Sequence, residues 1–418
     1  MYQKISINLS CLLLSLSDAL DLASSELSQH QLRTAFIAWE VGNVANLSSD
    51  EMEQLFIAAL LHDIGALSPE DKINIHHAEV INPEAHCILG ERILKRIPMF
   101  EPSSKIVRFH HTRWQTWGGK FEEALTFLSQ ILLLADTLER SLDRNQYILH
   151  QDQELVSKVG SMAGTSIDPK AVAMFRSIGF REDFWLDLVS PRLYSLLLHN
   201  GPCRGTEIDL SFLVAISELF RNIIDFRSHF TATHSSGVAA SASAISRLLG
   251  LTEVETELME VTGNLHDLGK MAVPNSILNK PDKLTKVEIA IIRQHTYFTY
   301  SVLSTIGGIQ QVAEWAAFHH ERLDGSGYPF HLEGKKLSIG ARIMAVADIF
   351  TSLSEDRPYR KGMKQHETLS ILKDLCVKGF IYKTIVRVLE ENYDEIVVLT
   401  KKRQIEALEC YEQEFAHL

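Results

Sequence analysis

The second half of the chain holds an ordered set of five histidines and two aspartates: His234, His266, Asp267, His295, His319, His320 and Asp348. Imidazole and carboxylate groups are ligands that borderline divalent cations such as iron, manganese and zinc accept. Seven such ligands suffice for two ions, and the adjacent pair His266-Asp267 offers one terminal and one bridging group. Two neighbouring metal ions activate a water molecule and bind phosphoryl oxygens. The pattern therefore predicts a binuclear site that hydrolyses a phosphate ester.

Each of these seven residues has a counterpart of the same type in the first half: His30, His62, Asp63, His86, His110, His111 and Asp136. The offset between counterparts is 204 residues for the first three, 209 for the next three and 212 for the last. Both halves keep 32 residues from the first histidine to the His-Asp pair, and 24 from the lone histidine to the His-His pair. This ordered recurrence indicates duplication of one structural unit.

Helices are the elements that we expect to position these residues. Apolar residues recur at helical spacing before the second His-Asp pair, as in Leu258, Val261 and Leu265. No series of short alternating segments indicates a sheet. Glycine and proline cluster at 200–205, near the middle of the chain, which predicts a domain boundary there. The sequence thus predicts an all-α protein of two tandem helical bundles, residues 1–200 and 208–418.

Composition excludes several classes of protein. The 418 residues are 45% hydrophobic and 22% charged, which is typical of globular proteins. A net charge of −12 argues against binding of a nucleic-acid polymer. The five cysteines are odd in number and form no CxxC pair, which favours a reducing cytoplasm. The apolar run Leu9 to Leu16 is too short to span a bilayer, so we expect a cytoplasmic protein without membrane contact.

Two motifs surround the metal-competent residues of the second half. Residues 266–270 read HDLGK, and residues 319–329 read HHERLDGSGYP. They resemble the HD-x-G-K core of the HD phosphohydrolases and the signature of their HD-GYP subfamily. The segments 273–280 and 347–360 are also similar to that subfamily, and the resemblance covers roughly residues 210 to 400. HD-GYP proteins are bacterial phosphodiesterases that hydrolyse cyclic dinucleotides, chiefly cyclic di-GMP, and one branch acts on 3′3′-cGAMP.

The resemblance implies a role for each matching position. The seven residues would hold two divalent ions, with Asp267 as the bridging ligand. Iron or manganese is favoured, and zinc, nickel and magnesium are alternatives. Lys270 would contact the scissile phosphate and stabilise the charge that develops there. Substrate contacts are implied for five further residues: Lys280, Asp324, Tyr328, Arg357 and Arg360. A metal-activated hydroxide would open the ring to a linear dinucleotide, and a second round would give mononucleotides.

Three positions depart from the pattern of the family. Phe230 stands where some members carry a glutamate that recruits a third metal, so two metals are predicted. Thr296 and Thr299 replace the proline and glycine of the usual His-Pro-x-x-Gly motif. We therefore expect the helix that carries His295 to pack differently. No residue separates cyclic di-GMP from 3′3′-cGAMP by a physical argument.

The first half keeps the seven metal-competent positions and lacks other parts of the motif. Ala66 stands at the position of Lys270, and no GYP sequence follows His110-His111. Cys87 follows the lone histidine, and Gly90 preserves the His-x-x-x-Gly spacing. Two interpretations stay open: a degenerate copy that stabilises or regulates the second half, or a second metal site that binds a ligand without turning it over.

The sequence thus predicts tandem HD domains, a degenerate first copy and a catalytic HD-GYP domain, that act as a cyclic-dinucleotide phosphodiesterase. One alternative is a non-catalytic cyclic-dinucleotide receptor or partner-binding regulatory protein. Another is an HD phosphohydrolase that acts on other nucleotides, against which the full GYP signature argues. Docking of diguanylate cyclase-type partners on the GYP loop and formation of a homodimer are further hypotheses.

Overall fold

Helices make up nearly all of the regular structure. The computed structural model describes residues 5–22, 27–77, 84–118, 122–227, 232–356 and 361–414. Arg357, Arg360 and Phe230 lie outside these ranges. Within them, the two-residue strands β1 (Ile7–Asn8) and β2 (Glu207–Ile208) form the one sheet. The prediction of an all-helical fold is confirmed. No helix in these ranges is both long and apolar enough to cross a membrane.

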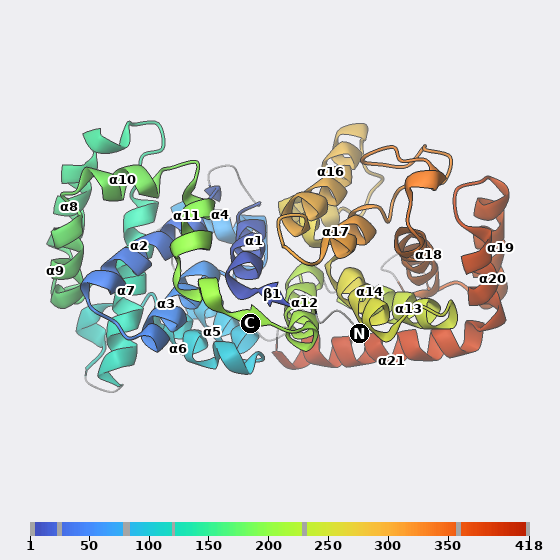
Figure 1. Cartoon of the computed structure of the whole chain (residues 1–418), viewed down its shortest axis with the longest axis horizontal. Coiled ribbons are helices and arrows are strands. Elements are labelled where there is room, and N and C mark those ends of the chain that lie inside the picture. The colour runs from blue at the N-terminus through green and yellow to red at the C-terminus, as the bar shows by residue number, and fades with distance from the viewer. Residues whose placement is uncertain are drawn as a thin grey trace. The chain divides into compact units, whose positions relative to one another are not determined.

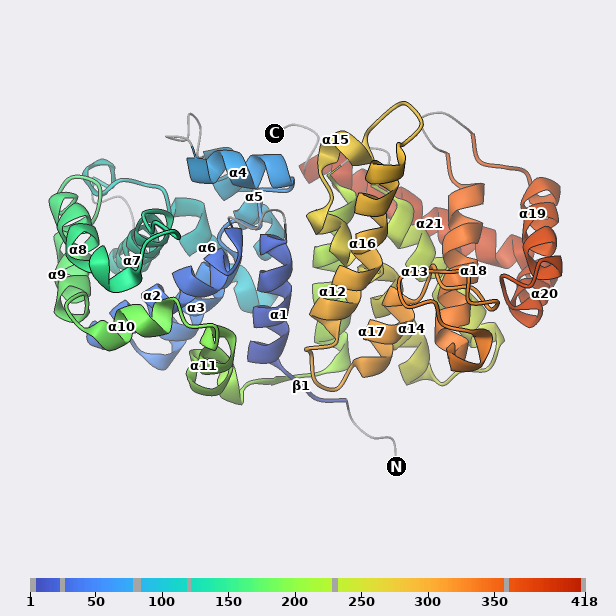
Figure 2. The same cartoon turned by 90° about the horizontal axis from the view of Figure 1, so that it is seen from above.

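The chain divides into two compact units. One comprises residues 8–66 and 70–207, and the other comprises 208–418 together with 1–7 and 67–69. They are called the first and second domain below. Figures 1 and 2 label the helices of each. The helices of the first domain are α1 (Leu9–Asp21), α2 (His30–Val44), α3 (Ser49–Leu61), α4 (Pro69–His77), α5 (Glu84–Leu94), α6 (Glu101–Phe109), α7 (Glu123–Arg140), α8 (Asp152–Ser161), α9 (Pro169–Ile178), α10 (Glu182–Leu188) and α11 (Leu193–Asn200).

The helices of the second domain are α12 (Leu210–Asp225), α13 (His234–Leu248), α14 (Glu253–Leu265), α15 (Asn275–Leu278), α16 (Lys286–Leu303), α17 (Gln310–Ala317), α18 (Ile339–Ser354), α19 (Gln365–Val377), α20 (Lys383–Glu391) and α21 (Tyr393–Glu414). Helix α13 packs against α14, α18 and α21, so it is the central helix of this domain. In the first domain α2 packs against α3 and α7 in the same way. The apolar sides of these helices form the buried core of each domain.

The duplication extends to the signals that begin helices. Helix α3 starts with a capping box between Ser48 and Glu51, and α14 starts with one between Thr252 and Glu255, at the same 204-residue offset. A capping box satisfies free backbone N–H groups and fixes the first turn. Both helices are 13 residues long, and the histidine of the His-Asp pair follows each. The sequence therefore places each His-Asp pair at the end of a helix.

A buried carboxylate precedes each central helix. The backbone N–H of Gln31 donates to Asp21, and the backbone N–H of Ser235 donates to Asp225 at 2.9 Å. In each case the donor is the second residue of its helix, α2 or α13, and the first residue of that helix is a candidate ligand histidine. An acidic group at a helix N-terminus satisfies free donors and suits the helix dipole. Asp21 and Asp225 thus fix the point from which the first histidine of each set projects.

Candidate metal centres

Five helices and the turns that follow them bring the seven second-domain candidates together. His234 begins α13, the His266-Asp267 pair follows α14, His295 lies within α16, the His-His pair follows α17, and Asp348 lies within α18. Three overlapping groups have ligand atoms within 4.8 Å of one another. They are His234 with His266 and Asp348, His266 with Asp267 and His319, and His295 with His319 and His320.

Asp267 lies between the two histidine groups. One of its oxygens is 3.2 Å from Nε2 of His266, and the other is 3.4 Å from Nε2 of His295. Asp348 faces the same space, because its Oδ1 is 3.3 Å from Nε2 of His234. A carboxylate with one oxygen toward each group has the arrangement that a bridging ligand requires.

The imidazole rings are oriented by backbone carbonyls. Nδ1 of His266 donates to the carbonyl of Gly263 at 2.8 Å, and Nδ1 of His319 donates to that of Ala316 at 2.5 Å. These carbonyls belong to the last turns of α14 and α17, where helix carbonyls lack an intrahelical partner. Because Nδ1 carries the proton, Nε2 is left with its lone pair free for a metal. Nε2 of His266 is buried and has no hydrogen-bond partner.

Burial and neighbouring charges keep three of these groups, His295, His319 and Asp267, in forms that bind metals. Burial lowers the pKa of His295 to about 3 and that of His319 well below its ordinary value, so both rings are neutral at pH 7. Burial alone would raise the pKa of Asp267, but His266 and Lys270 hold it well below its ordinary range. An ionised carboxylate among neutral imidazoles is the ligand set that a divalent cation requires.

Glu355 is a positioning residue that the sequence did not reveal. Its carboxylate accepts from Nδ1 of His234 at 3.1 Å. Burial alone would lower the pKa of His234, but Glu355 and Asp348 raise it to about 10. A carboxylate behind a ligand histidine fixes the ring and makes it a stronger ligand. In the first domain Glu139 occupies the same role, because its carboxylate lies 2.5 Å from Nδ1 of His30.

Lys270 lies beside the bridging position. Its Nζ donates to Asp267 at 2.5 Å. Burial alone would lower its pKa, but Asp267 raises it, so the side chain is a cation. Lys280 is instead paired with both carboxylate oxygens of Glu288, at 2.7 and 2.8 Å. The structure therefore brings Lys270 to the histidine groups and holds the Lys280 ammonium in an ion pair on α16.

The loop that contains the GYP sequence, residues 321–332 (the GYP loop), lines a cavity of about 400 Å³ next to the metal-competent groups. His319, His320 and Asp348 line this cavity, and so do Tyr328, Arg293 and Arg322. The Tyr328 ring lies 4.9 Å from that of His320, and the Arg293 guanidinium lies 4.9 Å from the Tyr328 ring. Arg293 was not predicted from the sequence, although it lies only two residues before His295.

The acidic residues of the loop have internal roles. Buried Glu321 accepts from the backbone N–H groups of Phe330 and Leu332, at 2.7 and 3.1 Å, and so ties the loop to the end of α17. Asp324 accepts from both the backbone N–H and the hydroxyl of Ser326. The Asp324 carboxylate therefore shapes the loop, and the residues that line the cavity do not include it.

Gly269 allows α16 to lie close to the turn after α14 that holds the His266-Asp267 pair, called the His-Asp turn below. A Cβ atom at this position would lie 2.0 Å from the carbonyl oxygen of His295, and a Cβ at Gly65 would lie equally close to that of His86. Thr299 adds a second link, because its hydroxyl accepts from the N–H of Gly269 and donates to the carbonyl of His266. The departure at Thr299 therefore joins α16 to the turn through two hydrogen bonds.

The first domain repeats this arrangement. One group is His30, His62 and Asp63, and another is His86, Cys87, His110 and His111. Asp63 lies 3.4 Å from Nε2 of His62 and 3.8 Å from Nε2 of His86. Asp136 lies 3.7 Å from Nε2 of His30 and of His62. All seven predicted positions of the first half are thus brought to one buried place.

Both donor sets fit divalent cations by their chemistry. Each presents imidazole nitrogens whose second nitrogen is already bonded to a carbonyl or carboxylate, and each has a carboxylate between two groups. The unpartnered Nε2 atoms of His266 and His111 are the buried donors or acceptors that an ion would satisfy. Iron, manganese and zinc all accept such ligands.

Comparison with known proteins agrees with this geometry. Models of the HD domain match residues 27–141 and residues 218–376. The 3′3′-cGAMP-specific phosphodiesterase 1 of Vibrio cholerae serotype O1 is 27% identical over 408 residues, which cover 94% of each chain. The cyclic di-GMP phosphodiesterase response regulator RpfG of Xanthomonas campestris is 39% identical over 151 residues, 36% of this chain and 40% of that protein.

A solved structure shares the fold. The crystal structure of a cyclic GMP-AMP-specific phosphodiesterase of V. cholerae, V-cGAP3, superposes with a TM-score of 0.65 at 24% identity, covering 93% of this chain and 98% of that one. The HD models match both domains, and in each domain the matched residues include the His-Asp pair. The chain therefore belongs to the HD-domain family, with one HD domain in each half.

Proposed function

We propose that the second domain hydrolyses a phosphodiester bond of a cyclic dinucleotide. The observation that carries this proposal is the position of Asp267, with one oxygen toward each histidine group and Lys270 on the same carboxylate. His319, His320 and Asp348 of the same site line a cavity that also presents Arg293 and Arg322. Two cations and several basic side chains suit a ligand with two phosphates, even though the whole chain is acidic.

The side chains of the second domain have separable roles in this reaction. The seven residues His234, His266, Asp267, His295, His319, His320 and Asp348 would hold two divalent ions, which supply an activated water and neutralise phosphoryl charge. Lys270 would turn from Asp267 to a non-bridging phosphate oxygen and stabilise its developing charge. One P–O bond forms from the water oxygen and one breaks at the ring, which gives a linear dinucleotide.

The wall of the cavity would hold the rest of the substrate. Arg293 and Arg322 would pair with the second phosphate, because guanidinium groups bind phosphate oxygens in pairs. Tyr328 would stack on a base, as aromatic rings do in many nucleotide sites. Lys280, Asp324, Arg357 and Arg360 keep the substrate roles that the family resemblance implies for them, although the Lys280 ammonium must first leave Glu288.

The first substrate to test is 3′3′-cGAMP. The relative named as specific for it matches nearly the whole chain, both domains included. Cyclic di-GMP is the second candidate, because the relative named for it is more similar in sequence over the segment that it shares. Association with diguanylate cyclase-type partners and formation of a homodimer stay predictions from the sequence.

Product analysis tests this proposal. Purified protein is loaded anaerobically with Fe²⁺ or Mn²⁺, and 3′3′-cGAMP and cyclic di-GMP are offered in parallel. We expect linear dinucleotide from 3′3′-cGAMP at the higher rate. A higher rate on cyclic di-GMP would reverse the order of the two substrates. Tight binding of either ring without any product, in protein that carries metal, would contradict the proposal and favour the receptor alternative.

A further inference from the structure

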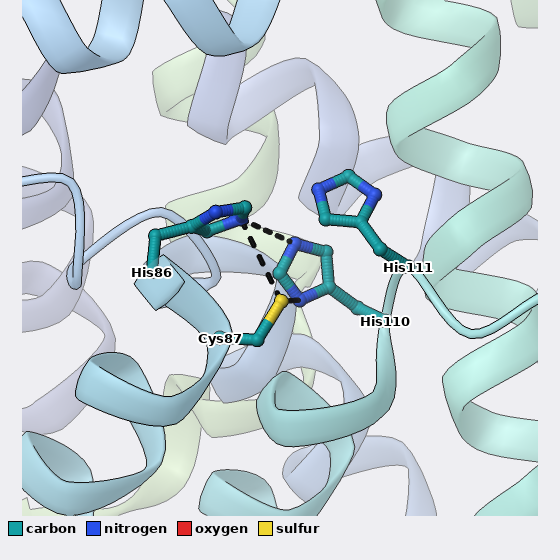
Figure 3. A group of neighbouring side chains, drawn as sticks. All are labelled: His86, Cys87, His110 and His111. Atoms are coloured by element: carbon teal, nitrogen blue, oxygen red, sulfur yellow. Dashed lines mark hydrogen bonds between the residues drawn. The ribbon is translucent and has the colours of Figure 1, made fainter. Parts of the chain in front are cut away.

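A cysteine joins one histidine group of the first domain. His86 and Cys87 come from α5, and His110 and His111 follow α6 (Figure 3). The Sγ atom of Cys87 lies 3.7 Å from Nε2 of His86 and 3.6 Å from Nδ1 of His110. Figure 3 shows the sulfur between these two rings, with His111 beside His110. The four residues place one ligand atom each within 4.8 Å of one another.

These separations match a tetrahedral metal site. Zinc binds imidazole nitrogen at about 2.0–2.1 Å and thiolate sulfur at about 2.3 Å. Two nitrogens on a tetrahedral ion are therefore about 3.4 Å apart, and a nitrogen and a sulfur about 3.6 Å apart. The Nε2 atoms of His86 and His110 are 3.4 Å apart, and Sγ is 3.7 Å from the first. Nε2 of His111 is buried without a hydrogen-bond partner, which leaves it available as a further ligand.

The second domain lacks this sulfur. At the offset of 209 residues the counterpart of Cys87 is Thr296, whose hydroxyl donates to the carbonyl of Arg293 within its own helix. The Nε2 atoms of His295 and His319 are also 3.4 Å apart, so the nitrogen frame is the same in both domains. Among the described residues, the metal-competent groups of the second domain contain no cysteine. The donor set has therefore changed in one copy only.

An arginine of the first domain spans the edge of its histidine groups. Arg140 reaches from Asp136, at 3.5 Å, to the carbonyl of Ile75 on α4. At the offset of 212 residues the counterpart of Arg140 is Ser352, which lines the cavity of the second domain. Zinc sites that lack an open coordination position are structural, whereas catalytic sites keep one for water or substrate.

We propose that the first domain holds a divalent cation of the zinc class on His86, Cys87, His110 and His111, with the Cys87 thiolate as a ligand, and that this ion is retained rather than used in hydrolysis. Thiolate and imidazole together select softer cations than the imidazole and carboxylate ligands of the second domain. The two domains thus differ in the metal that they prefer. This inference does not depend on the activity of the second domain.

Cobalt substitution tests the thiolate ligand directly. Metal-free full-length protein is titrated with Co²⁺ without oxygen, and the near-ultraviolet thiolate-to-cobalt charge-transfer band is recorded. We expect the band in the unaltered protein and in Cys203→Ser, which removes another buried thiol of the same domain. We expect its loss in Cys87→Ser, together with Zn²⁺ binding to the first domain that is weaker by at least about tenfold. A band that persists in Cys87→Ser, or is absent from protein with bound Co²⁺, would overturn the proposal.

A second measurement needs no substitution. X-ray absorption at the zinc edge of the zinc-loaded full-length chain reports the atoms bound to the ion. A sulfur shell at about 2.3 Å is expected beside the nitrogen shell at about 2.0 Å. Nitrogen and oxygen shells alone, with both domains loaded, would overturn the proposal even if Cys87→Ser failed to fold.

Discussion

Single residues of this chain are oriented by local backbone geometry. His62, His110, His266 and His319 each follow the last turn of a helix, and each donates Nδ1–H to a carbonyl three residues earlier. The free carbonyls at helix ends make this bond available. The ligand-competent Nε2 atoms of both domains are therefore set in place by the backbone before any ion binds.

Removal of the Lys270 ammonium tests its role in hydrolysis. In Lys270→Gln the phosphate loses the cation that lies 2.5 Å from Asp267. We expect kcat to fall by roughly 10²- to 10³-fold, as for the loss of one charge-stabilising donor, with the metal content unchanged. Steady-state kinetics and metal analysis measure both quantities. The exposed Lys283→Gln is the matched control, and equal rates for the two variants would refute a catalytic role for Lys270.

A substitution of Glu355 tests whether the carboxylate behind a ligand histidine contributes to metal binding. In Glu355→Gln the carboxylate that accepts from Nδ1 of His234 becomes a neutral amide. We expect metal affinity of the second domain to fall about 10- to 100-fold, because such partners orient and strengthen ligand histidines. Competition titration against a metal indicator gives the affinity. The exposed Glu253→Gln serves as control, and unchanged affinity in Glu355→Gln would show that His234 needs no such partner.

The two positioning carboxylates also show where sequence reasoning stopped. The seven metal-competent positions of each half could be predicted because they recur at fixed offsets. Glu139 lies three residues after Asp136, whereas Glu355 lies seven residues after Asp348. The same contact is therefore made from within α7 in the first domain and from the residue after α18 in the second, so the offset that relates the two aspartates does not relate the two glutamates. Arg293 escaped prediction for a different reason, because the GYP loop that it faces is distant in sequence.

At the scale of elements, the His-Asp turn and α16 fit together only through a glycine. A Cβ on Gly269 would lie 2.0 Å from the carbonyl oxygen of His295. In Gly269→Ala the helix must shift, and His295 shifts with it. We expect a loss of stability of about 1–3 kcal/mol, as for an overpacked core, and weaker metal binding. Thermal unfolding with and without metal measures both effects.

Gly307→Ala is the matched control for this change. A Cβ at Gly307 has open space around it, so stability and metal binding should both be unaltered. If Gly269→Ala had the same stability and metal binding as Gly307→Ala, α16 would accommodate a Cβ atom at residue 269. The steric explanation for the glycine of the HD-x-G-K motif would then be wrong.

The helical elements were predictable from the spacing of apolar residues, but the detailed packing of the helices was not. Thr299 was expected only to alter how α16 packs. The structure shows that its hydroxyl bonds both Gly269 and His266 across 30 and 33 residues of sequence. A contact between segments so far apart leaves no trace in local patterning, which explains why the direction of the change could not be foreseen.

At the scale of the whole molecule, one unit has been duplicated and its copies have diverged in chemistry. Both copies keep a 3.4 Å separation between paired Nε2 atoms and a carboxylate between two groups. The second copy has Lys270 and a cavity beside its histidines. The first has Ala66 at the position of Lys270, Cys87 at that of Thr296 and Arg140 at that of Ser352. These differences support our proposal that the second domain alone carries out hydrolysis.

The most direct test compares the same substitution in the two copies. Asp267→Asn and Asp63→Asn each remove the charge of a carboxylate that lies between two histidine groups. The rate of 3′3′-cGAMP hydrolysis and the metal content per chain are measured for both variants and for the unaltered protein. The account predicts that Asp267→Asn abolishes turnover and lowers metal content, whereas Asp63→Asn lowers metal content and retains turnover. Turnover that survives in Asp267→Asn, or is lost only in Asp63→Asn, would contradict it.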